Sequence, residues 1–476
     1  MAQMDTTTSR GSSLRVFAGL LVAVSLVLFG CTPSAETVSP PVETPDTFSA
    51  SGPQPVPDRW WTAFEDERLN ALVDTATASN FTLRTAWQRL QASQAVVDRE
   101  SGALFPDLQA SGQGSVTGTE GETETSDGFD REDENLQVGL SSAYEVDLWG
   151  RIRSRVQAER FRARASRADY QTAALSVSAE VVRTWAQLAE ARSQLRLVEE
   201  QIDTNVKVLN LLENRFETGQ IRSVDVLRQR QLVESTREQR TVVESRVQVL
   251  EHQLAVLLGR PPQAGVEALP DSLPQLPPLP DAGVPTDLVQ RRPDVRRAHN
   301  LLKAADRDLA AAISNQYPRL TLSASASSAA ESAGDLFQTW AYSFAGNLLA
   351  PIFRGGALRA EVDRTEAVRT QRLYEYGQTI LTAFQEVENA LIREKKQRER
   401  IQDLEQQVAL AQQAYEQLRV QYFNGAVDYL DVLTALDEVQ QLRRDRLAAE
   451  LTLVEDRIAL YRALAGGFET DREREQ

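Results

Sequence analysis

Residues 401–425 read IQDLEQQVALAQQAYEQLRVQYFNG and carry the most regular pattern in the chain. Their apolar positions are spaced alternately by three and four residues: Ile401, Leu404, Val408, Ala411, Tyr415, Leu418 and Tyr422. A repeat of this kind is typical of α-helices that pack in a left-handed coiled coil. Gly425 then suits a helix C-cap, and a return helix is expected to begin near Tyr429.

An earlier segment repeats this pattern. Its apolar positions include Leu195, Val198, Ile202, Leu209, Leu212 and Phe216, and Asn205 is the one polar residue in the series. It ends at Gly219, with a return helix expected near Ser223. No proline interrupts residues 152–217 or 357–423, so each stretch predicts a helix of about 66 residues, roughly 100 Å long. Because an average helix has about 12 residues, the sequence predicts two unusually long antiparallel helical hairpins.

The two hairpins belong to a larger internal repeat. Adding 212 to the numbers of Leu83, Leu90, Pro106 and Leu108 gives Val295, Leu302, Pro318 and Leu320. Adding 206 to those of Gly219, Asp225 and Leu258 gives Gly425, Asp431 and Leu464. The offset falls by six, so the first half carries about six extra residues, which we assign to an acidic insertion at residues 117–135. A period this long indicates duplication of a whole structural unit.

Segments with a period of two lie between the helices. Residues 136–148 alternate apolar with polar or small side chains, and residues 320–326 do the same. Residues 340–344 and, more weakly, 106–116 continue the pattern. Alternation predicts strands with one apolar face, and about 10 residues can cross a bilayer as a barrel strand. The acidic insertion is then expected to be an extracellular loop, and the alternative for these segments is a small soluble sheet.

Four strands in one chain cannot close a transmembrane barrel, because the smallest barrels have eight and lipid does not tolerate open edges. Two copies give eight strands and a filled interior, whereas three give 12 strands and the beginning of an aqueous lumen. The expected fold class is therefore mixed α and membrane β. With three copies it would be a trimeric 12-stranded transmembrane β-barrel, with four strands per chain, continuous with a long α-helical coiled-coil barrel.

The amino terminus has the features of a secretory signal. Two arginines precede an apolar run at residues 16–30, which is too short to span a bilayer comfortably. The run ends Leu28-Phe29-Gly30-Cys31, which resembles the lipobox of bacterial lipoproteins and makes Cys31 the expected lipidation site. Thr32 follows, where retention in the inner membrane would require Asp, so this resemblance points to the outer membrane. The alternative is a plain signal peptide with an unmodified cysteine.

Proline marks the connectors. Sixteen of the 19 prolines lie in residues 33–57 and 261–293, where they exclude long helices and central strands. We expect a signal peptide at 1–30, a lipidated linker at 31–58, a first repeat at 59–259, a connector at 260–293, a second repeat at 294–466 and a C-terminal tail at 467–476. Within the repeats, we expect barrel hairpins near 104–149 and 317–353 and long helical hairpins at 152–258 and 356–464.

Composition argues against catalytic and nucleic-acid-binding functions. The chain has 52 Lys and Arg against 68 Asp and Glu, a net charge of −16, so a surface that neutralises nucleic-acid phosphates is not expected. One cysteine and two histidines leave too few ligands for a His/Cys metal site. Both histidines, His252 and His299, lie in helical stretches, and no P-loop, G-x-S-x-G or H-E-x-x-H motif is present. We expect no enzyme activity and no cofactor except covalent lipid on Cys31.

The chain resembles the TolC-like outer membrane factors, in the NodT-like lipoprotein branch of outer membrane efflux proteins that serves tripartite pumps of the RND type. The resemblance covers almost all of the mature chain and depends on the order of several short motifs. These are Trp60-Trp61 with Phe64 and Leu69, Asp147-Leu148-Trp149-Gly150-Arg151, Arg291-Arg292-Pro293-Asp294-Val295, Pro351-Ile352-Phe353-Arg354-Gly355-Gly356, and the turns at residues 219–227 and 425–433.

This resemblance implies an outer membrane channel that passively conducts drugs or other small molecules from the periplasm to the exterior, as the exit duct of an RND-type efflux pump. It implies a homotrimer, lipid-anchored on the periplasmic side of the outer membrane, with its helical barrel in the periplasm. The expected partners are a periplasmic adaptor (membrane fusion protein), an inner-membrane RND pump and outer membrane lipid, and no nucleic acid is expected.

By the same resemblance, the hairpin tips form a periplasmic gate and contact the adaptor. The residues concerned are Gly219, Asp225, Gly425, Leu430 and Asp431. Leu430 and Asp431 are expected to face the threefold axis, while Thr434 stands where some members have a second acidic residue. We therefore expect one ring of three carboxylates at most. Closure is assigned to apolar contact from Leu430 and to hydrogen bonds between helices.

Two alternatives stay open on the sequence. A type I secretion channel shares the architecture, although the lipobox favours drug efflux. A lipid-anchored periplasmic coiled-coil structural protein, from another class, accounts for Cys31 and the heptads but leaves the alternating strands and duplicated turns without a purpose. A heat-modifiable trimer that conducts ions in planar bilayers distinguishes a channel from such a spacer.

Overall fold

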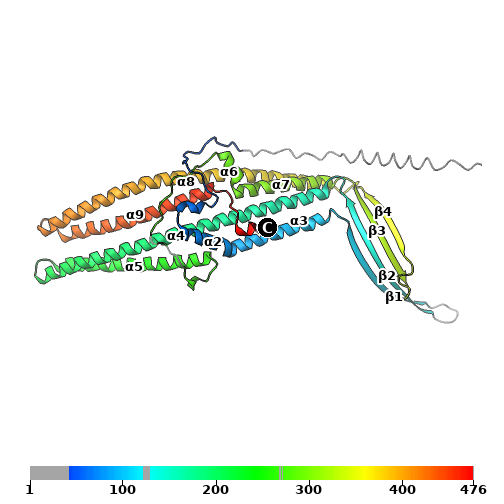
Figure 1. Ribbon diagram of the computed structural model, residues 1–476, viewed down its shortest axis with the longest axis horizontal. Coiled ribbons are helices and arrows are strands. Elements are labelled where there is room, and N and C mark those ends of the chain that lie inside the picture. Colours follow the sequence, from blue (N-terminus) through cyan, green and yellow to red (C-terminus); the bar gives the residue numbers. More distant parts are fainter. Residues whose placement is uncertain (1–41, 122–128, 267–269, 271, 475–476) are drawn as a thin grey trace, which may run out of the picture. The chain divides into compact units, whose positions relative to one another are not determined.

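The computed structural model describes residues 42–121, 129–266, 270 and 272–474 (Figure 1). The chain divides into two compact units. The first includes Gln91–Arg164 and Asn300–Tyr374, and the second comprises Pro41–Leu90, Ala165–His299 and Glu375–Gln476. Each sequence repeat contributes to both units, so the division into units cuts across the internal repeat.

The helices show the internal repeat directly. Adding 212 to both bounds of α3 (Phe81–Gly102) gives those of α7 (Pro293–Ser314), and adding 206 to those of α4 (Arg151–Glu217) gives those of α8 (Ala357–Phe423). With 67 residues each, α4 and α8 confirm the long helices predicted from the absence of proline. The return helices are α5 (Ser223–Leu257) and α9 (Tyr429–Leu464). Both begin where the sequence predicted.

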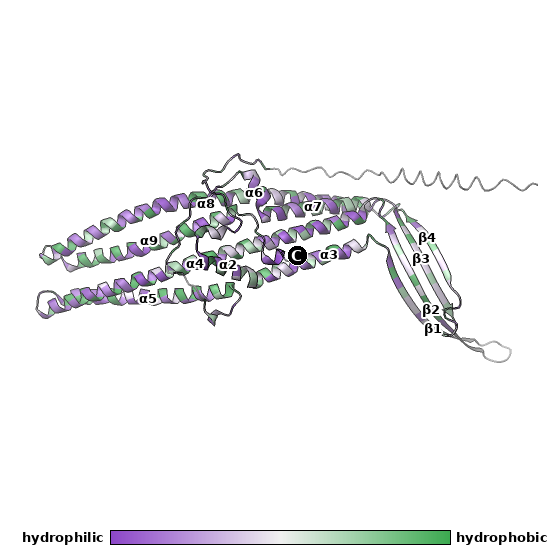
Figure 2. Cartoon of the chain, viewed as in Figure 1, coloured by the Kyte–Doolittle hydropathy of each residue, from purple (hydrophilic) through white to green (hydrophobic). Residues whose placement is uncertain are grey.

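The heptad positions form the seam of the second helical hairpin. Leu404 of α8 is buried in one apolar cluster with Leu442 and Ala449 of α9. Ile401, Val408 and Ala411 pack against that cluster. In Figure 2, apolar and polar residues alternate along the whole of each long helix, as expected for helices with one buried stripe.

The strands form one antiparallel sheet in the order β1–β2–β3–β4. Its strands are β1 (Asp107–Gly121), β2 (Phe129–Val146), β3 (Arg319–Ala330) and β4 (Ala341–Leu349). This order leaves β1 and β4 as the two edges of the sheet.

The two faces of the sheet differ in polarity. Seven of the eight exposed large apolar side chains in the described strands lie on one face: Leu108, Val116, Leu140, Leu322, Tyr342, Phe344 and Leu348. We call this the apolar face. On the opposite, polar face, Glu145 pairs with Thr321, and the hydroxyls of Ser325 and Ser343 are 2.8 Å apart. The alternation can be followed along each arrow in Figure 2.

The acidic insertion is mostly strand. The register of β1 with β2 continues from Asp107↔Ala143 to Gly121↔Phe129, which takes in most of residues 117–135. The prediction of a loop across this segment was wrong, because backbone pairing can continue after the apolar alternation has ended. Strands β1 and β2 have 15 and 18 residues, against 12 and 9 in β3 and β4, and this extra length lies where the repeat offset changes.

The Trp60-Trp61 motif builds an aromatic core in the second unit. Both indoles are buried in the 3₁₀ helix η1 (Trp60–Phe64), which precedes α2 (Glu67–Ser79). Trp60 stacks on Tyr461 with ring centroids 5.9 Å apart, and Trp61 meets Phe468 edge-on at 4.8 Å. These contacts join the start of the first repeat to the end of the second repeat and to the C-terminal tail.

A buried arginine holds the proline-rich connector, whose short helices are η2 (Pro262–Ala264) and α6 (Pro285–Arg291). Arg457 of α9 donates hydrogen bonds to both carboxylate oxygens of Glu394, at 2.8 and 2.5 Å. It also donates to the backbone carbonyls of Pro277 and Pro278. Carbonyl groups of the connector thereby accept hydrogen bonds from a fully buried guanidinium.

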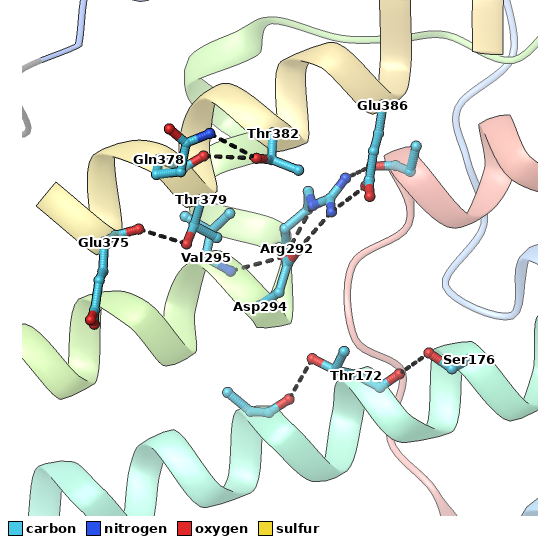
Figure 3. A network of polar contacts seen from close by, with 12 residues as sticks. Thr172, Ser176, Arg292, Asp294, Val295, Glu375, Gln378, Thr379, Thr382 and Glu386 are labelled. Carbon is cyan, nitrogen blue, oxygen red and sulfur yellow. Dashed lines mark hydrogen bonds and ion pairs between the residues drawn. The ribbon is translucent and has the colours of Figure 1, made fainter. Parts of the chain in front are cut away.

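The Arg292-Pro293-Asp294 motif fixes the start of α7 (Figure 3). Pro293 occupies the first helical position, where its missing N–H removes no helical hydrogen bond. Arg292 donates to both carboxylate oxygens of Asp294, at 3.0 and 2.7 Å, and to Glu386 of α8 at 2.6 Å. Burial alone would raise the pKa of the Asp294 carboxyl, but hydrogen bonding and the charge of Arg292 hold it below its usual value.

The chain ends in the short helix α10 (Asp471–Arg474). None of the helices in the described ranges is both long and apolar enough to cross a membrane.

Candidate functional site: the hairpin tips

The tips of the two helical hairpins pack against each other within the second unit (Figure 1). We call residues 219–227 the first tip and residues 425–433 the second tip. Leu212 and Val226 of the first hairpin form one buried cluster with Tyr429 and Val432 of the second. The two tips therefore lie against each other, although none of the five predicted tip residues belongs to this cluster.

Both tips reverse with the same backbone geometry. Gly219 and Gly425 have φ angles of +73° and +74°, in the left-handed region that favours glycine. The N–H of Gln220 donates to Arg215 and that of Gly219 to Phe216, at 2.9 and 2.8 Å. Ala426 and Gly425 make the same pair of bonds to α8, at 2.9 and 3.0 Å. Each tip therefore has a Schellman-type cap, as the glycines predicted.

The side chains at the N-caps of the return helices carry opposite charges. Arg222 precedes α5, and Asp428 occupies the equivalent position before α9. The Arg222 guanidinium donates to the Asp428 carboxylate at 3.2 Å, and both side chains are well exposed. An ion pair between equivalent positions thus joins the two tips.

The paired aspartates lie in different environments. Asp225 is buried, with its carboxylate 3.5 Å from the Arg222 guanidinium. Its other carboxylate oxygen is buried and has no hydrogen-bond partner among the described residues. Asp431 is exposed, and so is its neighbour Leu430. Thr434 donates its hydroxyl to the Leu430 carbonyl, so its side chain is turned toward its own helix.

A buried polar network, which no sequence motif predicted, lies beside the apolar cluster. The Tyr429 hydroxyl donates to the side-chain oxygen of Gln229 at 2.5 Å. The Gln229 amide donates to the Asn205 carbonyl at 2.8 Å. Asn205 and Gln440 exchange side-chain hydrogen bonds at 2.8 and 3.2 Å. Asn205, the one break in the heptad series, was the sequence feature that could have indicated this network, because its amide binds the opposite hairpin.

Tyr429 is the central residue of this site. Its ring lies in the apolar cluster and its hydroxyl in the polar network. Burial raises the pKa of the Tyr429 phenol well above its usual value, and nearby Tyr415, Tyr422 and Asp225 add to the shift. The phenol therefore remains a neutral hydrogen-bond donor at physiological pH.

Within the described residues, no group of three or more His, Cys, Asp or Glu side chains could hold a metal ion. The predicted lipidation site, Cys31, lies outside the described residues.

Comparison with known proteins agrees with this architecture. The profile of the outer membrane efflux protein family matches residues 72–260 and 284–466. The chain belongs to the outer membrane efflux protein family. The starts of its two matched segments differ by 212 and their ends by 206, which are the offsets between the repeated helices.

Individual relatives of this outer membrane efflux protein cover nearly its whole length. The pyoverdine export outer membrane protein OpmQ of Pseudomonas aeruginosa is 33% identical over 472 residues, 95% of this chain and 97% of the relative. The solvent efflux pump outer membrane protein SrpC of Pseudomonas putida is 30% identical, over 85% and 86%. The outer-membrane channel OprN has a TM-score of 0.81 at 29% identity, covering 90% of this chain and 99% of that one.

These likenesses confirm the predicted family, the fold class and the function as an outer membrane exit channel for efflux. Members of the family are channel proteins. The coiled-coil spacer considered on sequence grounds is ruled out, because the repeated strands and turns belong to the matched regions.

Proposed function

We propose that three copies of this chain form the exit duct of a tripartite RND-type pump, which conducts drugs or other small molecules out of the periplasm. The observation that carries the proposal is the two-sided sheet. Its apolar face leaves Phe344 and Tyr342 89% and 71% exposed, which is unfavourable in water and favourable against lipid.

The open edges of the sheet support assembly. β1 and β4 each have one side without a strand partner in the described sheet. In lipid, unpaired backbone groups on such edges would each cost several kcal/mol, so β4 of one copy should pair with β1 of the next. Three copies then give 12 strands, with the polar face toward an aqueous lumen.

A lipid on Cys31 forms the second membrane attachment in this proposal. Acyl chains contribute about 0.8 kcal/mol per buried methylene, whereas barrel closure removes whole strand faces from water. The lipid therefore assists delivery and assembly, while the barrel holds the protein in the outer membrane.

The tips form the periplasmic gate and the contact with a periplasmic adaptor. The exposure of Leu430 and Asp431 supports this role, because the side chains are available to neighbouring copies or to a partner. The Tyr429 network and the Arg222–Asp428 pair hold the two hairpins of one copy together.

Purified membrane protein tests the proposal. We expect a trimer that dissociates on heating and forms channels in planar bilayers, and a Cys31→Ser variant with lower assembly yield but nearly normal conductance per trimer. A monomeric protein without channel activity would contradict the duct. A Cys31→Ser protein recovered entirely soluble would show instead that the lipid is the main anchor.

A further inference from the structure

The first unit contains a basic cluster in an acidic protein. Residues 151–164, at the start of α4, hold six arginines and one glutamate, although the whole chain has a net charge of −16. Such local reversal of charge requires a physical reason, because like charges destabilise one another at close range. The environment of these arginines in the first unit supplies one.

Part of the cluster is neutralised by the strands that precede α4. Arg151 donates to both carboxylate oxygens of Glu145, at 3.0 and 2.7 Å. Arg153 pairs with Asp147 at 3.1 Å. Asp147 also accepts the first backbone N–H groups of α4 and so acts as a helix cap. These two arginines have structural roles.

Three arginines at the same junction have no such partner. Within the described part of the chain, no carboxylate forms an ion pair with Arg155, Arg319 or Arg354. Arg319 donates to the Asn315 side chain at 2.8 Å. Arg155 lines the same hollow as Asn315, and the Arg354 carbonyl accepts from Ala357, the first residue of α8, at 3.1 Å. The charges of Arg151, Arg155 and Arg354 all act on the Arg319 guanidinium, and Glu145 offsets them in part. We call Arg155, Arg319 and Arg354 the arginine triad.

Two members of the triad, Arg319 and Arg155, lie toward the polar side of the sheet. Arg319 is the first residue of β3 and shares its face with Thr321, Ser323 and Ser325, whereas Leu320 and Leu322 point to the apolar face. Arg155 lies four residues after Arg151, on the same side of α4, and Arg151 binds Glu145 of the polar face. A lipid headgroup on the apolar side is therefore the less favoured ligand.

A cavity of about 400 Å³ between α4, α7 and α8 reaches one member of the triad. Arg155 and Asn315 line it, together with Arg162 and Arg364. These two arginines are balanced by Asp308 and Glu361. Arg155 therefore supplies unbalanced positive charge at a hollow large enough for a carboxylate- or phosphate-bearing group, and Arg319 is bonded to Asn315 in its wall.

We propose that Arg155, Arg319 and Arg354 form an anion-binding site for cargo that carries carboxylate or phosphate groups, at the junction of barrel and helices. The inference rests on the proposed trimeric duct, in which the polar face lines the lumen and the triad occurs three times. Guanidinium groups bind such anions through charge-assisted, often bidentate hydrogen bonds. The site gives an otherwise acidic duct a local attraction for anionic solutes.

Block of single channels by inorganic triphosphate tests this site in bilayers of uncharged lipid. We expect reversible block of the wild-type channel, with the half-blocking concentration raised about tenfold or more in Arg155→Gln/Arg319→Gln/Arg354→Gln, because a lost charged hydrogen bond weakens binding by about that factor. Arg153→Gln is the matched control, because Arg153 is already paired with Asp147. Its half-blocking concentration should stay near that of the wild type.

Trimer content, measured by heat-modifiable mobility, verifies assembly of each variant. If the triple variant does not assemble, the single changes Arg155→Gln and Arg354→Gln, both at exposed positions, should each still weaken block. Wild-type channels that triphosphate does not block would overturn the anion site and leave the duct intact. Absence of channels altogether would overturn the duct as well. Loss of bound anionic phospholipid from the triple variant, with unchanged triphosphate block, would show that the triad faces lipid and overturn the cargo site.

Discussion

The two hairpin tips have the same backbone and different side-chain roles. Their glycine caps match within one degree in φ, and their return helices begin at Ser223 and Tyr429, which are equivalent positions in the repeat. In the first tip Asp225 is buried, and in the second the equivalent Asp431 is exposed. At this pair of positions a duplicated backbone has therefore diverged, with one side chain packed inward and its equivalent facing outward.

The largest expected difference concerns Tyr429 and its counterpart Ser223. Tyr429 is buried in both the apolar cluster and the polar network, whereas Ser223 is exposed. We expect Tyr429→Ala to lower the free energy of tip opening by about 4 kcal/mol, since a large ring and a buried hydrogen bond are lost. Ser223→Ala should change it by less than about 0.5 kcal/mol. Hydrogen exchange of the tip amides measures both, and equal effects would mean that the tips are not asymmetric.

The glycine caps should behave alike. Neither Gly219 nor Gly425 has another atom within 4 Å of the place where a Cβ would lie, so alanine meets only the backbone penalty of a positive φ. We expect Gly219→Ala and Gly425→Ala each to destabilise its tip by about 1 kcal/mol in the same exchange experiment. If alanine destabilised one tip more than twice as much as the other, the effect of the cap would depend on the side chains around it as well as on the shared backbone.

The backbone of the two tips could be predicted from the sequence more completely than the roles of their side chains. Heptad spacing, proline absence and paired glycines are local signals, and they predicted the helices and both caps. The burial of Asp225 depends on contacts of α5 with the hairpin of the other repeat, which no local pattern encodes. Asn205 was visible as a break in the heptads, but its partner Gln440 belongs to the second hairpin, far away in the sequence. The arginine triad likewise forms only once β3 and α4 come together.

Leu430 and its counterpart Val224 test whether the second tip is the gate. Both are partly exposed, so truncation has little effect on the fold. If Leu430 closes the duct by apolar contact between copies, Leu430→Ala should increase single-channel conductance and the vancomycin sensitivity of the host, and Asp431→Ala should do so less. Val224→Ala should leave both near the wild-type values. Unchanged conductance in a Leu430/Asp431 double variant with intact trimers would place the gate elsewhere along the tunnel.

The smallest expected effect concerns the ion pair between the tips. Arg222 and Asp428 are 3.2 Å apart, with side chains 61% and 74% exposed. Water screens such a pair, so a double-mutant cycle of Arg222→Gln and Asp428→Asn should give a coupling of about 0.5 kcal/mol or less, falling further at high salt. Arg222 also lies beside buried Asp225, so Arg222→Gln alone should destabilise the first tip more than Asp428→Asn destabilises the second. A salt-independent coupling several times larger would mean that the pair is shielded from water, and that the two tips are held together by this bridge rather than by Tyr429 and its network.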